Sequence, residues 1–405
     1  MSWKRIQMNN RILSKFKGNP QIDDGTAYTV LFAMGFCHLL NDMIQSVIPA
    51  MYPLLKDNFG FTFAQIGIIT LVFQLTSSVL QPFVGRYADR HPQPYSLSMG
   101  MCFTLVGLLV LALASDFGVI LLAVALIGCG SSVFHPEASR VAQMASGGNG
   151  GSSIGPLLAA LIIIPYGQSA VAWFAVAALL ASTILVRIGY WYSLMLVHVE
   201  TSRRIDSVSV CGLSQGTIRK ALAILVIMIF SKYFFISCMT SYFTFFLIEK
   251  FGVTVQQSQI CLFAFLAALA VGTLLGGFLG DKYGRKYVIL FSILGAAPFT
   301  LVLPYLDLFG TIAMAVVIGL VIASAFSAIL VYATDLKPDK IGMISGIFFG
   351  LMFGLGGIGS AFFGWLADET SIEFVFKIST LLPLLGVIAC FLPNIKPSNK
   401  KENRI

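Results

Sequence analysis

Polar side chains follow one face of the first long apolar stretch of the chain. Their spacing of i, i+3, i+4 and i+7 places them on the same side of a helix: His38, Asn41, Asp42 and Gln45. An aspartate inside a membrane-spanning helix costs about 2.5–3.5 kcal/mol on insertion scales, so it is usually retained where it faces a watery or functional interior. We interpret Asp42 and His38 as candidate proton carriers, and the two amides as candidate substrate contacts. The alternative is that Asp42 only hydrogen-bonds a neighbouring helix.

A second polar stripe lies in the next apolar stretch. It repeats the spacing with amides and hydroxyls: Gln74, Ser77, Ser78 and Gln81. Such side chains either line a substrate path or hold helices together, and the second use is the commoner one in membranes. Both uses stay open here, with Gln74 as the candidate substrate contact.

The fourth apolar stretch ends in a cluster of titratable residues. An imidazole, a proline, a carboxylate and a guanidinium follow one another closely: His135, Pro136, Glu137 and Arg140. Glu137 and Arg140 stand at i, i+3 and can pair, which by itself would only end a helix at the membrane surface. A carboxylate below that surface is more typical of function, so Glu137 and His135 are further candidate proton carriers. Arg140 is a candidate substrate contact, or a partner for Asp89.

A lysine stands deep within the seventh apolar stretch. Lys232 precedes a stripe of hydroxyl-bearing side chains that begins at Tyr233. A buried ammonium beside such donors favours an anionic ligand, so Lys232 and Tyr233 are candidate substrate contacts. The alternative is a structural salt bridge between Lys232 and Asp42, which lie at similar depths in their helices.

The composition is that of an integral membrane protein. Of 405 residues, 57% are hydrophobic and 11% are charged, whereas ordinary soluble domains carry about 25% charged residues. The net charge of +8 comes from Lys and Arg in short loops rather than from one basic face, which argues against nucleic-acid binding. The sequence has no phosphate-binding loop, nucleophile elbow or metal-ligand spacing. We expect neither an enzyme nor a bound cofactor or metal.

Apolar stretches of about 20 residues, the length that crosses a bilayer, predict an all-α membrane protein with twelve transmembrane helices. In the first half they cover 27–53, 63–85, 96–114, 117–140, 149–165 and 169–192. In the second half they cover 219–247, 257–279, 286–305, 309–334, 340–366 and 373–392. The polar segments 1–26, 193–218 and 393–405 are predicted to be an N-terminal segment, a linker and a tail.

The two halves repeat one unit. Residues 277–282 match residues 85–90 at an offset of 192 residues, the distance from Gly85 to Gly277. The same shift relates two further sets: Phe251, Gly252, Thr254 and Gln257, and Phe59, Gly60, Thr62 and Gln65. One gapless offset across a loop, a helix and a second loop indicates an internal duplication.

The basic residues predict the orientation of the chain. With the N-terminus inside the cell, the outer loops hold only Lys56 and Lys250, and the other loop Lys and Arg residues lie inside. Both termini are therefore predicted to be cytoplasmic. The fifth span offers only about 21 Å of helix at 1.5 Å per residue, against a bilayer core of roughly 30 Å. Either the glycine-rich segment before it enters the membrane, or a piece present in relatives is missing.

Two groups of residues resemble the motifs of a known family. Gly277, Asp281, Gly284 and Arg285 resemble the loop signature that the major facilitator superfamily places between the second and third helices of each half. The matching gating-loop residues of the first half are Gly85, Asp89 and Arg90. The fifth-helix motif of the superfamily's drug and proton antiporters is similar to Gly151, Gly155 and Pro156.

Four segments carry a closer similarity to exporters of phosphonate antibiotics such as fosmidomycin: 38–46, 134–137, 231–234 and 324–332. The resemblance implies a monomeric antiporter of the bacterial inner membrane that expels a small anionic drug in exchange for protons. Its two halves would rock about a central site, with the loops at Asp89 and Asp281 latching the inward-closed state. A proton symporter that imports an anionic metabolite is the alternative within this fold, and a pore or sensor is the alternative outside it.

Overall fold

The computed structural model describes residues 24–90, 93–145, 163–199, 214–337 and 341–394, and every regular element in these ranges is a helix. The first group of helices comprises α2 (Asp24–Ala50), α3 (Tyr52–Phe59), α4 (Phe63–Arg90), α5 (Ser96–Ala112), α6 (Phe117–Ala145), α8 (Ile164–Tyr166), η2 (Gln168–Trp173) and α9 (Phe174–Val199). The second group comprises α10 (Gln215–Phe251), α11 (Val255–Tyr283), α12 (Arg285–Ile293), η3 (Leu294–Ala296), α13 (Ala297–Val302), η4 (Leu303–Tyr305), α14 (Leu308–Ala323), α15 (Ala325–Leu336), α16 (Ile341–Glu369), α17 (Ile372–Ser379) and η6 (Leu382–Phe391).

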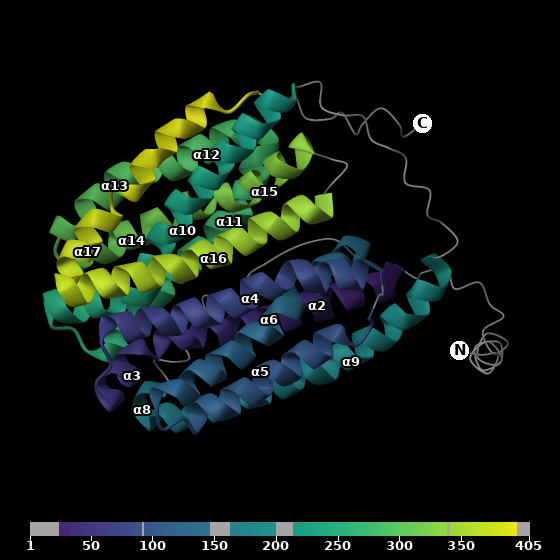
Figure 1. Ribbon diagram of the computed structural model, residues 1–405, viewed down its shortest axis with the longest axis horizontal. Coiled ribbons are helices and arrows are strands. Elements are labelled where there is room, and N and C mark those ends of the chain that lie inside the picture. Colours follow the sequence, from purple (N-terminus) through teal and green to yellow (C-terminus); the bar gives the residue numbers. More distant parts are fainter. Residues whose placement is uncertain (1–23, 91–92, 146–162, 200–213, 338–340, 395–405) are drawn as a thin grey trace.

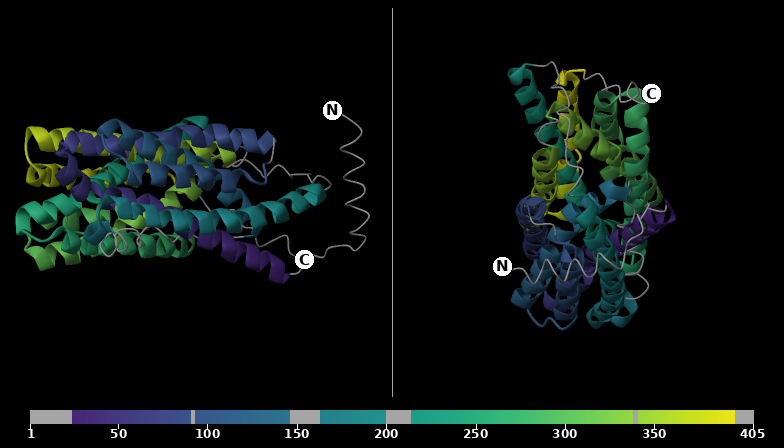
Figure 2. Two further views of the ribbon diagram at one scale, coloured as in Figure 1. Left: turned by 90° about the horizontal axis from the view of Figure 1, so that it is seen from below. Right: turned by 90° about the vertical axis from the view of Figure 1, so that its right-hand side faces the viewer.

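The two groups form two layers, as Figure 1 shows. Helices α2 to α9 lie on one side, helices α10 to α17 lie on the other, and α4 and α16 run side by side where the layers meet. Most of the helices run along the long axis of the molecule (Figure 2). We call the end where α4 and α11 finish the loop end, and the end where α4 begins and α16 finishes the opposite end.

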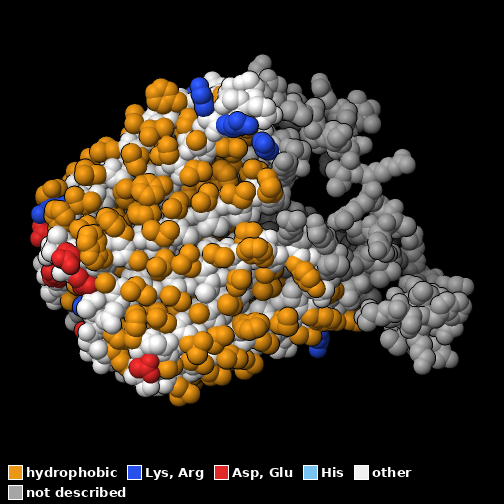
Figure 3. Space-filling model, viewed as in Figure 1, with side chains coloured by type: hydrophobic (Ala, Val, Ile, Leu, Met, Phe, Trp, Pro, Cys, Tyr) orange, Lys and Arg blue, Asp and Glu red, His pale blue; other side chains and the backbone are white. Residues whose placement is uncertain are grey.

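The lengths and compositions of the helices fit a membrane. Among the described residues, nine helical stretches are long and apolar enough to span a bilayer, and Ser96–Ala112 is a shorter apolar helix. On the face drawn in Figure 3, hydrophobic side chains cover the middle and the few charged side chains lie near the edges. The predicted all-helical membrane fold is confirmed. Eleven of the twelve predicted ranges contain described helices, and the fifth falls almost wholly on residues 146–162, outside the described part.

The sequence repeat is also a structural repeat. At the start of α4, Gln65 N–H donates to Thr62 Oγ1 at 3.2 Å and Thr62 N–H donates to Gln65 Oε1 at 3.0 Å. Thr254 and Gln257 make the same capping box at the start of α11. The glycine before each box, Gly60 or Gly252, has a positive φ of 66° or 65°, a conformation that glycine adopts without a steric penalty. Equivalent residues therefore end one helix and begin the next in both groups.

The sequence predicted loops at the two charged repeats, residues 85–90 and 277–282. In the structure both repeats are helical. Helix α4 continues to Arg90, and α11 continues to Tyr283 before the chain turns at Gly284, whose φ is 93°. The prediction placed the ends where the apolar residues stop. A helix satisfies its own backbone hydrogen bonds, so it can extend past the apolar layer until a residue such as Gly284 breaks it.

Glycines that recur every three or four residues on α16 and α11 allow close helix packing at several positions. On α16, a Cβ added at Gly357 would lie 3.2 Å from Leu71 of α4. On α11, one added at Gly276 would come closer still to the backbone of Ser324. Gly346, nearer the loop end of α16, has no atom within 4 Å of such a Cβ. Helices α16 and α4 are therefore in close contact around Gly357, and this contact is not seen among the described atoms at Gly346.

Candidate functional site

The carboxylate of Asp42 is held by neighbours on its own helix. His38 Nε2 lies 3.4 Å from Asp42 Oδ2, and Asn41 Nδ2 donates to Asp42 Oδ1 at 3.5 Å. The ring of Phe134, from α6, stacks on His38 with centroids 5.6 Å apart. The side chains of His38 and Asp42 are 12% and 17% exposed, so both are largely withdrawn from solvent without being sealed. An imidazole and a carboxyl in this contact can pass a proton between them.

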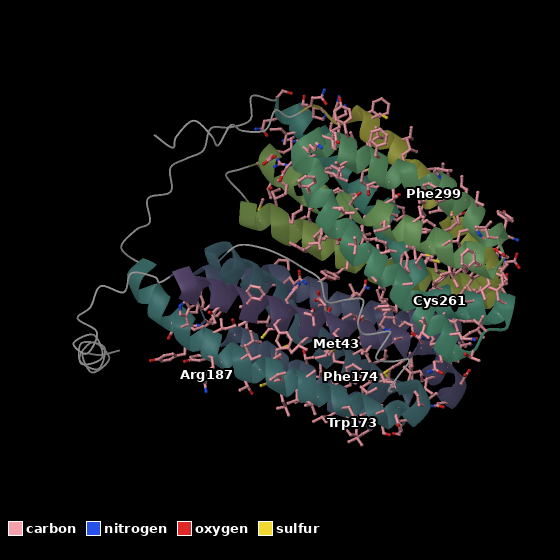
Figure 4. All side chains as sticks on the ribbon, turned by 180° about the vertical axis from the view of Figure 1, so that it is seen from behind. Met43, Trp173, Phe174, Arg187, Cys261 and Phe299 are labelled. Atoms are coloured by element: carbon pink, nitrogen blue, oxygen red, sulfur yellow. The ribbon has the colours of Figure 1, made fainter. Side chains whose placement is uncertain are left out.

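The stripe on α2 also presents polar atoms that have no partner. Asn41 Oδ1 and Gln45 Nε2 are buried and make no hydrogen bond with described residues. Met43, on another face of α2, packs within the first layer, whereas Trp173 lies at the layer's outer edge (Figure 4). Buried polar atoms are normally paired with protein, water or ligand. The unpaired amide atoms beside Asp42 thus provide hydrogen-bonding capacity for water or a substrate.

The stripe on α4 serves both of the uses that the sequence left open. Ser77 Oγ donates to Ser131 Oγ of α6 at 3.2 Å, which holds two helices of one layer together. Gln74 instead faces the second layer, because a Cβ added at Gly356 of α16 would lie 2.5 Å from its Oε1. That oxygen and Gln81 Nε2 are buried without a partner among the described residues. Gln74 therefore lies at the boundary between the two layers.

The ammonium group of Lys232 is buried and has no carboxylate partner among the described residues. The residue is 2% exposed, and among the described residues its Nζ donates one long hydrogen bond, of 3.4 Å to the carbonyl of Ala323. The ring centroids of Tyr233 and Phe326 lie 5.5 and 5.7 Å from Nζ. No described carboxylate pairs with Lys232, and Asp42 contacts His38 and Asn41 instead. The proposed salt bridge between Lys232 and Asp42 is absent, which leaves the ammonium without a counter-charge inside the described structure.

The carbonyl that holds Lys232 belongs to a broken helix. Helix α14 ends at Ala323 and α15 begins at Ala325, and the hydroxyl of Ser292 enters the gap. Ser292 Oγ lies 2.6 Å from Val321 O and accepts the N–H of Ala325 at 2.9 Å. A side chain inserted into the helical ladder is a recognised cause of a kink. Sequence reasoning missed Ser292, because a serine in an apolar stretch carries no signal of its partners.

At the loop end, the described gating residues pair within the second layer. Arg285 forms ion pairs with Asp335, at the end of α15, and with Asp281 Oδ1 at 3.8 Å. Gly284 provides the turn between α11 and α12, and Gly277 lies on α11. Asp335 is a partner that the sequence analysis did not identify. In the first layer, Gly85, Asp89 and Arg90 lie on α4, and their side chains fall outside the described part.

At the opposite end, hydrogen bonds join the two layers. Asp368 of α16 accepts the backbone N–H groups of Phe63 and Ala64, at 2.8 and 2.7 Å, in the first turn of α4. The hydroxyls of Thr70 and Ser241 lie 3.4 Å apart, and Tyr242 donates toward the carbonyl of Phe63 at 3.3 Å. These bonds close this end. Asp368 is not among the residues predicted from the sequence, although the Thr62 cap marks a helix N-terminus, which attracts anions.

The remaining candidates lie where side chains are not described. His135, Glu137 and Arg140 are on α6, whose backbone remains helical through Pro136 to Ala145. Gly151, Gly155 and Pro156 lie outside the described residues. Within the described part, no group of three His, Cys, Asp or Glu side chains could hold a metal ion.

Solved structures share the fold. The crystal structure of the nucleoside transporter NupG superposes with a TM-score of 0.66 at 15% identity, covering 89% of this chain and 98% of that one. A bacterial homologue of the human lysosomal transporter Spinster, in an inward-facing and unoccupied conformation, gives 0.63 at 16% identity, covering 90% and 94%.

Two curated proteins are much closer in sequence. The Fosmidomycin resistance protein of Escherichia coli (strain K12) is 56% identical over 382 residues, 91% of this chain and 94% of that protein. The uncharacterized MFS-type transporter YfnC of Bacillus subtilis (strain 168) is 39% identical over 384 residues, with the same coverage. Each alignment is longer than the part of this chain that it covers, which is 91% of 405 residues. Each relative therefore has some residues without a counterpart here.

The family model agrees with these similarities. The model of the Major Facilitator Superfamily matches residues 34–246 and 225–405, which together include both helical layers. This match, the helical spans and the two close relatives lead to one assignment. The chain belongs to the Major Facilitator Superfamily and is a multi-pass membrane transporter of a small substrate rather than an enzyme.

Proposed function

We propose that this transporter expels a small phosphonate-bearing anion, of the kind represented by fosmidomycin, from the cytoplasm in exchange for protons. The name of the relative that is 56% identical supports the substrate class. The observation that carries the proposal is Lys232, a 2% exposed ammonium with no carboxylate partner among the described residues. A buried charge is costly unless it is paired, and an anionic substrate would supply the missing charge.

Access to Lys232 would begin with movement of the aromatic side chains beside it. Tyr233 and Phe326 flank the ammonium and are themselves only half-buried. Their displacement would bring a phosphonate oxygen within hydrogen-bonding distance of Nζ, while Asn41, Gln45 and Gln74 would offer amide contacts from the first layer. Arg140 remains a predicted contact from α6.

Proton coupling is assigned to the pair on α2. Asp42 would carry the transported proton, and His38, in contact with it at 3.4 Å, would exchange protons with the cavity. Glu137 and His135 on α6 remain predicted as further carriers. Protonated Asp42 is neutral, so its passage through an apolar barrier costs less than that of the carboxylate.

The proposed cycle alternates which end is closed. The bonds of Asp368 close the opposite end in this structure, and the gating residues around Asp89 and Asp281 would close the loop end in the other state. We propose that the loop end faces the cytoplasm, with both chain termini, in a bacterial inner membrane. The rocking units would be residues 27–192 and 219–392 of a monomer, with the motif at Gly151, Gly155 and Pro156 in the fifth helix.

Inside-out vesicles, acidified inside by respiration, test the proposal directly. Addition of fosmidomycin should release protons from wild-type vesicles, as read by a pH-sensitive dye, and should not do so from vesicles with Asp42→Asn. The matched control is Asp307→Asn, because Asp307 caps α14 through Gly310 N–H at 2.9 Å and asparagine caps equally well. Proton release by Asp42→Asn at the wild-type rate would exclude Asp42 as the carrier.

The direction of drug movement separates the two coupled alternatives. An antiporter accumulates labelled fosmidomycin inside acidified inside-out vesicles, whereas a symporter drives it out with the protons. A pore would equilibrate the drug without accumulation in either direction. Accumulation that collapses when a protonophore is added is the result that the proposal requires.

A further inference from the structure

The second layer has an apolar groove that the transport proposal does not use. It has a volume of about 570 Å³ and lies between α11 and α12, over the break between α14 and α15. Leu275 and Leu279 form one wall, Tyr287 and Phe291 form the other, and Val321 and Ser324 form the floor. All of these elements lie within candidate membrane spans. The groove therefore belongs to the part of the protein that the bilayer surrounds.

The walls show that the groove opens outward. Phe291 is 69% exposed, and Leu275 and Tyr287 are each 49% exposed, although they are in helices apolar enough to span a membrane. Side chains exposed at that depth contact lipid rather than water. The groove thus faces the lipid, on the half of the bilayer next to the loop end, because Tyr283 at the end of α11 also lines it.

Two lysines directly precede, in the chain, tyrosines that line the groove. Lys282 Nζ lies 5.1 Å from the ring centroid of the groove residue Tyr283, and Lys286 directly precedes the groove residue Tyr287. The other charged groups nearby are engaged with one another, because Arg285 pairs with both Asp281 and Asp335. No described carboxylate pairs with Lys282 or Lys286. These lysines therefore add positive charge beside the tyrosines of the groove, whose remaining lining is mainly apolar.

An apolar groove with lysines and tyrosines near one end matches the acyl chain and the headgroup of a phospholipid. Tyrosines favour the headgroup level of a membrane, and basic pockets between transmembrane helices bind anionic headgroups. We propose that the groove binds an anionic phospholipid, with its phosphate at Lys282 and Lys286 and one acyl chain along Val321 and Ser324. The lipid then covers the helix break that Ser292 holds open and that positions the Ala323 carbonyl under Lys232.

Native mass spectrometry of the full-length chain in detergent tests the proposal without any transport assay. The probes are phosphatidylglycerol and phosphatidylcholine with identical acyl chains, titrated separately. Each lysine near the surface is worth about 1 kcal/mol toward an anionic lipid, so Lys282→Gln and Lys286→Gln together should weaken phosphatidylglycerol binding roughly 30-fold. Phosphatidylcholine binding should change little in the same variant.

Two further variants locate the lipid. Arg219→Gln with Lys220→Gln removes the same charge from exposed residues of α10, outside the groove lining, and should leave binding unchanged. Leu275→Trp fills the groove and should displace both lipids, with folding checked by thermal melting. Equal loss in the α10 control would show a non-specific charge effect. Equal affinity for the two lipids, or full binding by a folded Leu275→Trp protein, would overturn the proposal.

Discussion

The carboxylate of Asp368 caps a helix of the other layer, accepting the N–H of Phe63 at 2.8 Å and that of Ala64 at 2.7 Å. A carboxylate at a helix N-terminus is stabilised by the unpaired N–H groups and by the helix dipole. Because the two partners belong to different layers, this contact must break when the opposite end opens. We therefore expect Asp368 to act as a latch for one of the two proposed transport states.

Removal of the latch charge should shift the balance between those states. Asp368→Asn is expected to weaken the closed opposite end by about 1 kcal/mol, since the site is exposed to solvent. Spin labels at Asn58 and Glu249, both exposed at this end, should then report a longer-distance population about fivefold larger than in wild type. The matched control is Glu369→Gln, because the neighbouring exposed carboxylate forms no ion pair with described residues. Identical distance distributions in Asp368→Asn and wild type would rule out the latch.

The pair His38 and Asp42 should behave as one unit in proton coupling. His38→Gln is expected to reduce drug-driven proton flux, and adding His38→Gln to Asp42→Asn should cause no further loss. The reason is that residues in direct contact give non-additive effects. Initial rates of dye recovery in the vesicle assay measure all four proteins of the cycle. Because Asp42→Asn alone is expected to abolish proton release, the deciding comparison is His38→Gln with wild type, and a wild-type rate in His38→Gln would show that Asp42 works without His38.

Lys232 should lower the melting temperature of the drug-free protein and should be required for drug binding. Lys232→Met replaces an unpaired buried ammonium with an apolar side chain of similar length, so the protein without drug should melt at a higher temperature. Fosmidomycin should raise the melting temperature of wild type by mass action and leave that of the variant unchanged. Thermal melting in detergent, with and without drug, provides both readings. A variant that melts lower and is still stabilised by drug would contradict the proposed anion site.

The hydroxyl of Ser292 should control the break in the tenth span. Ser292→Ala removes the acceptor of the Ala325 N–H, and an unpaired buried N–H costs about 1–3 kcal/mol. We expect faster hydrogen exchange at the amide of Ala325 and slower drug export. Ser324→Ala is the control, since among the described residues Ser324 Oγ donates to Val321 O within its own helical turn. Unchanged exchange at Ala325 in Ser292→Ala would show that the break persists without the inserted hydroxyl.

The features that the sequence predicted correctly depend on short stretches of chain. Apolar length predicted eleven described helical ranges, because crossing a bilayer sets a minimum length whatever the neighbouring helices do. The capping boxes at Thr62 and Thr254 were visible as a repeat, because their partners stand three residues away. The contact between His38 and Asp42 follows from the i, i+4 geometry of one helix. The helix ends at Arg90 and Tyr283 were predicted too early, because apolar length says nothing about where the backbone turns.

The tertiary structure alone decided the partners of the polar residues that lie far apart in the chain. Lys232 meets Ala323 rather than Asp42, and Asp368 meets Phe63, whose position is 305 residues away. Ser292 enters a helix that begins beyond the next loop. Helical spacing determines the face on which a side chain lies, but not the helix that packs against that face. The packing of the two layers makes that choice, and it thereby decides which charge is paired, which helix is broken and which end is closed.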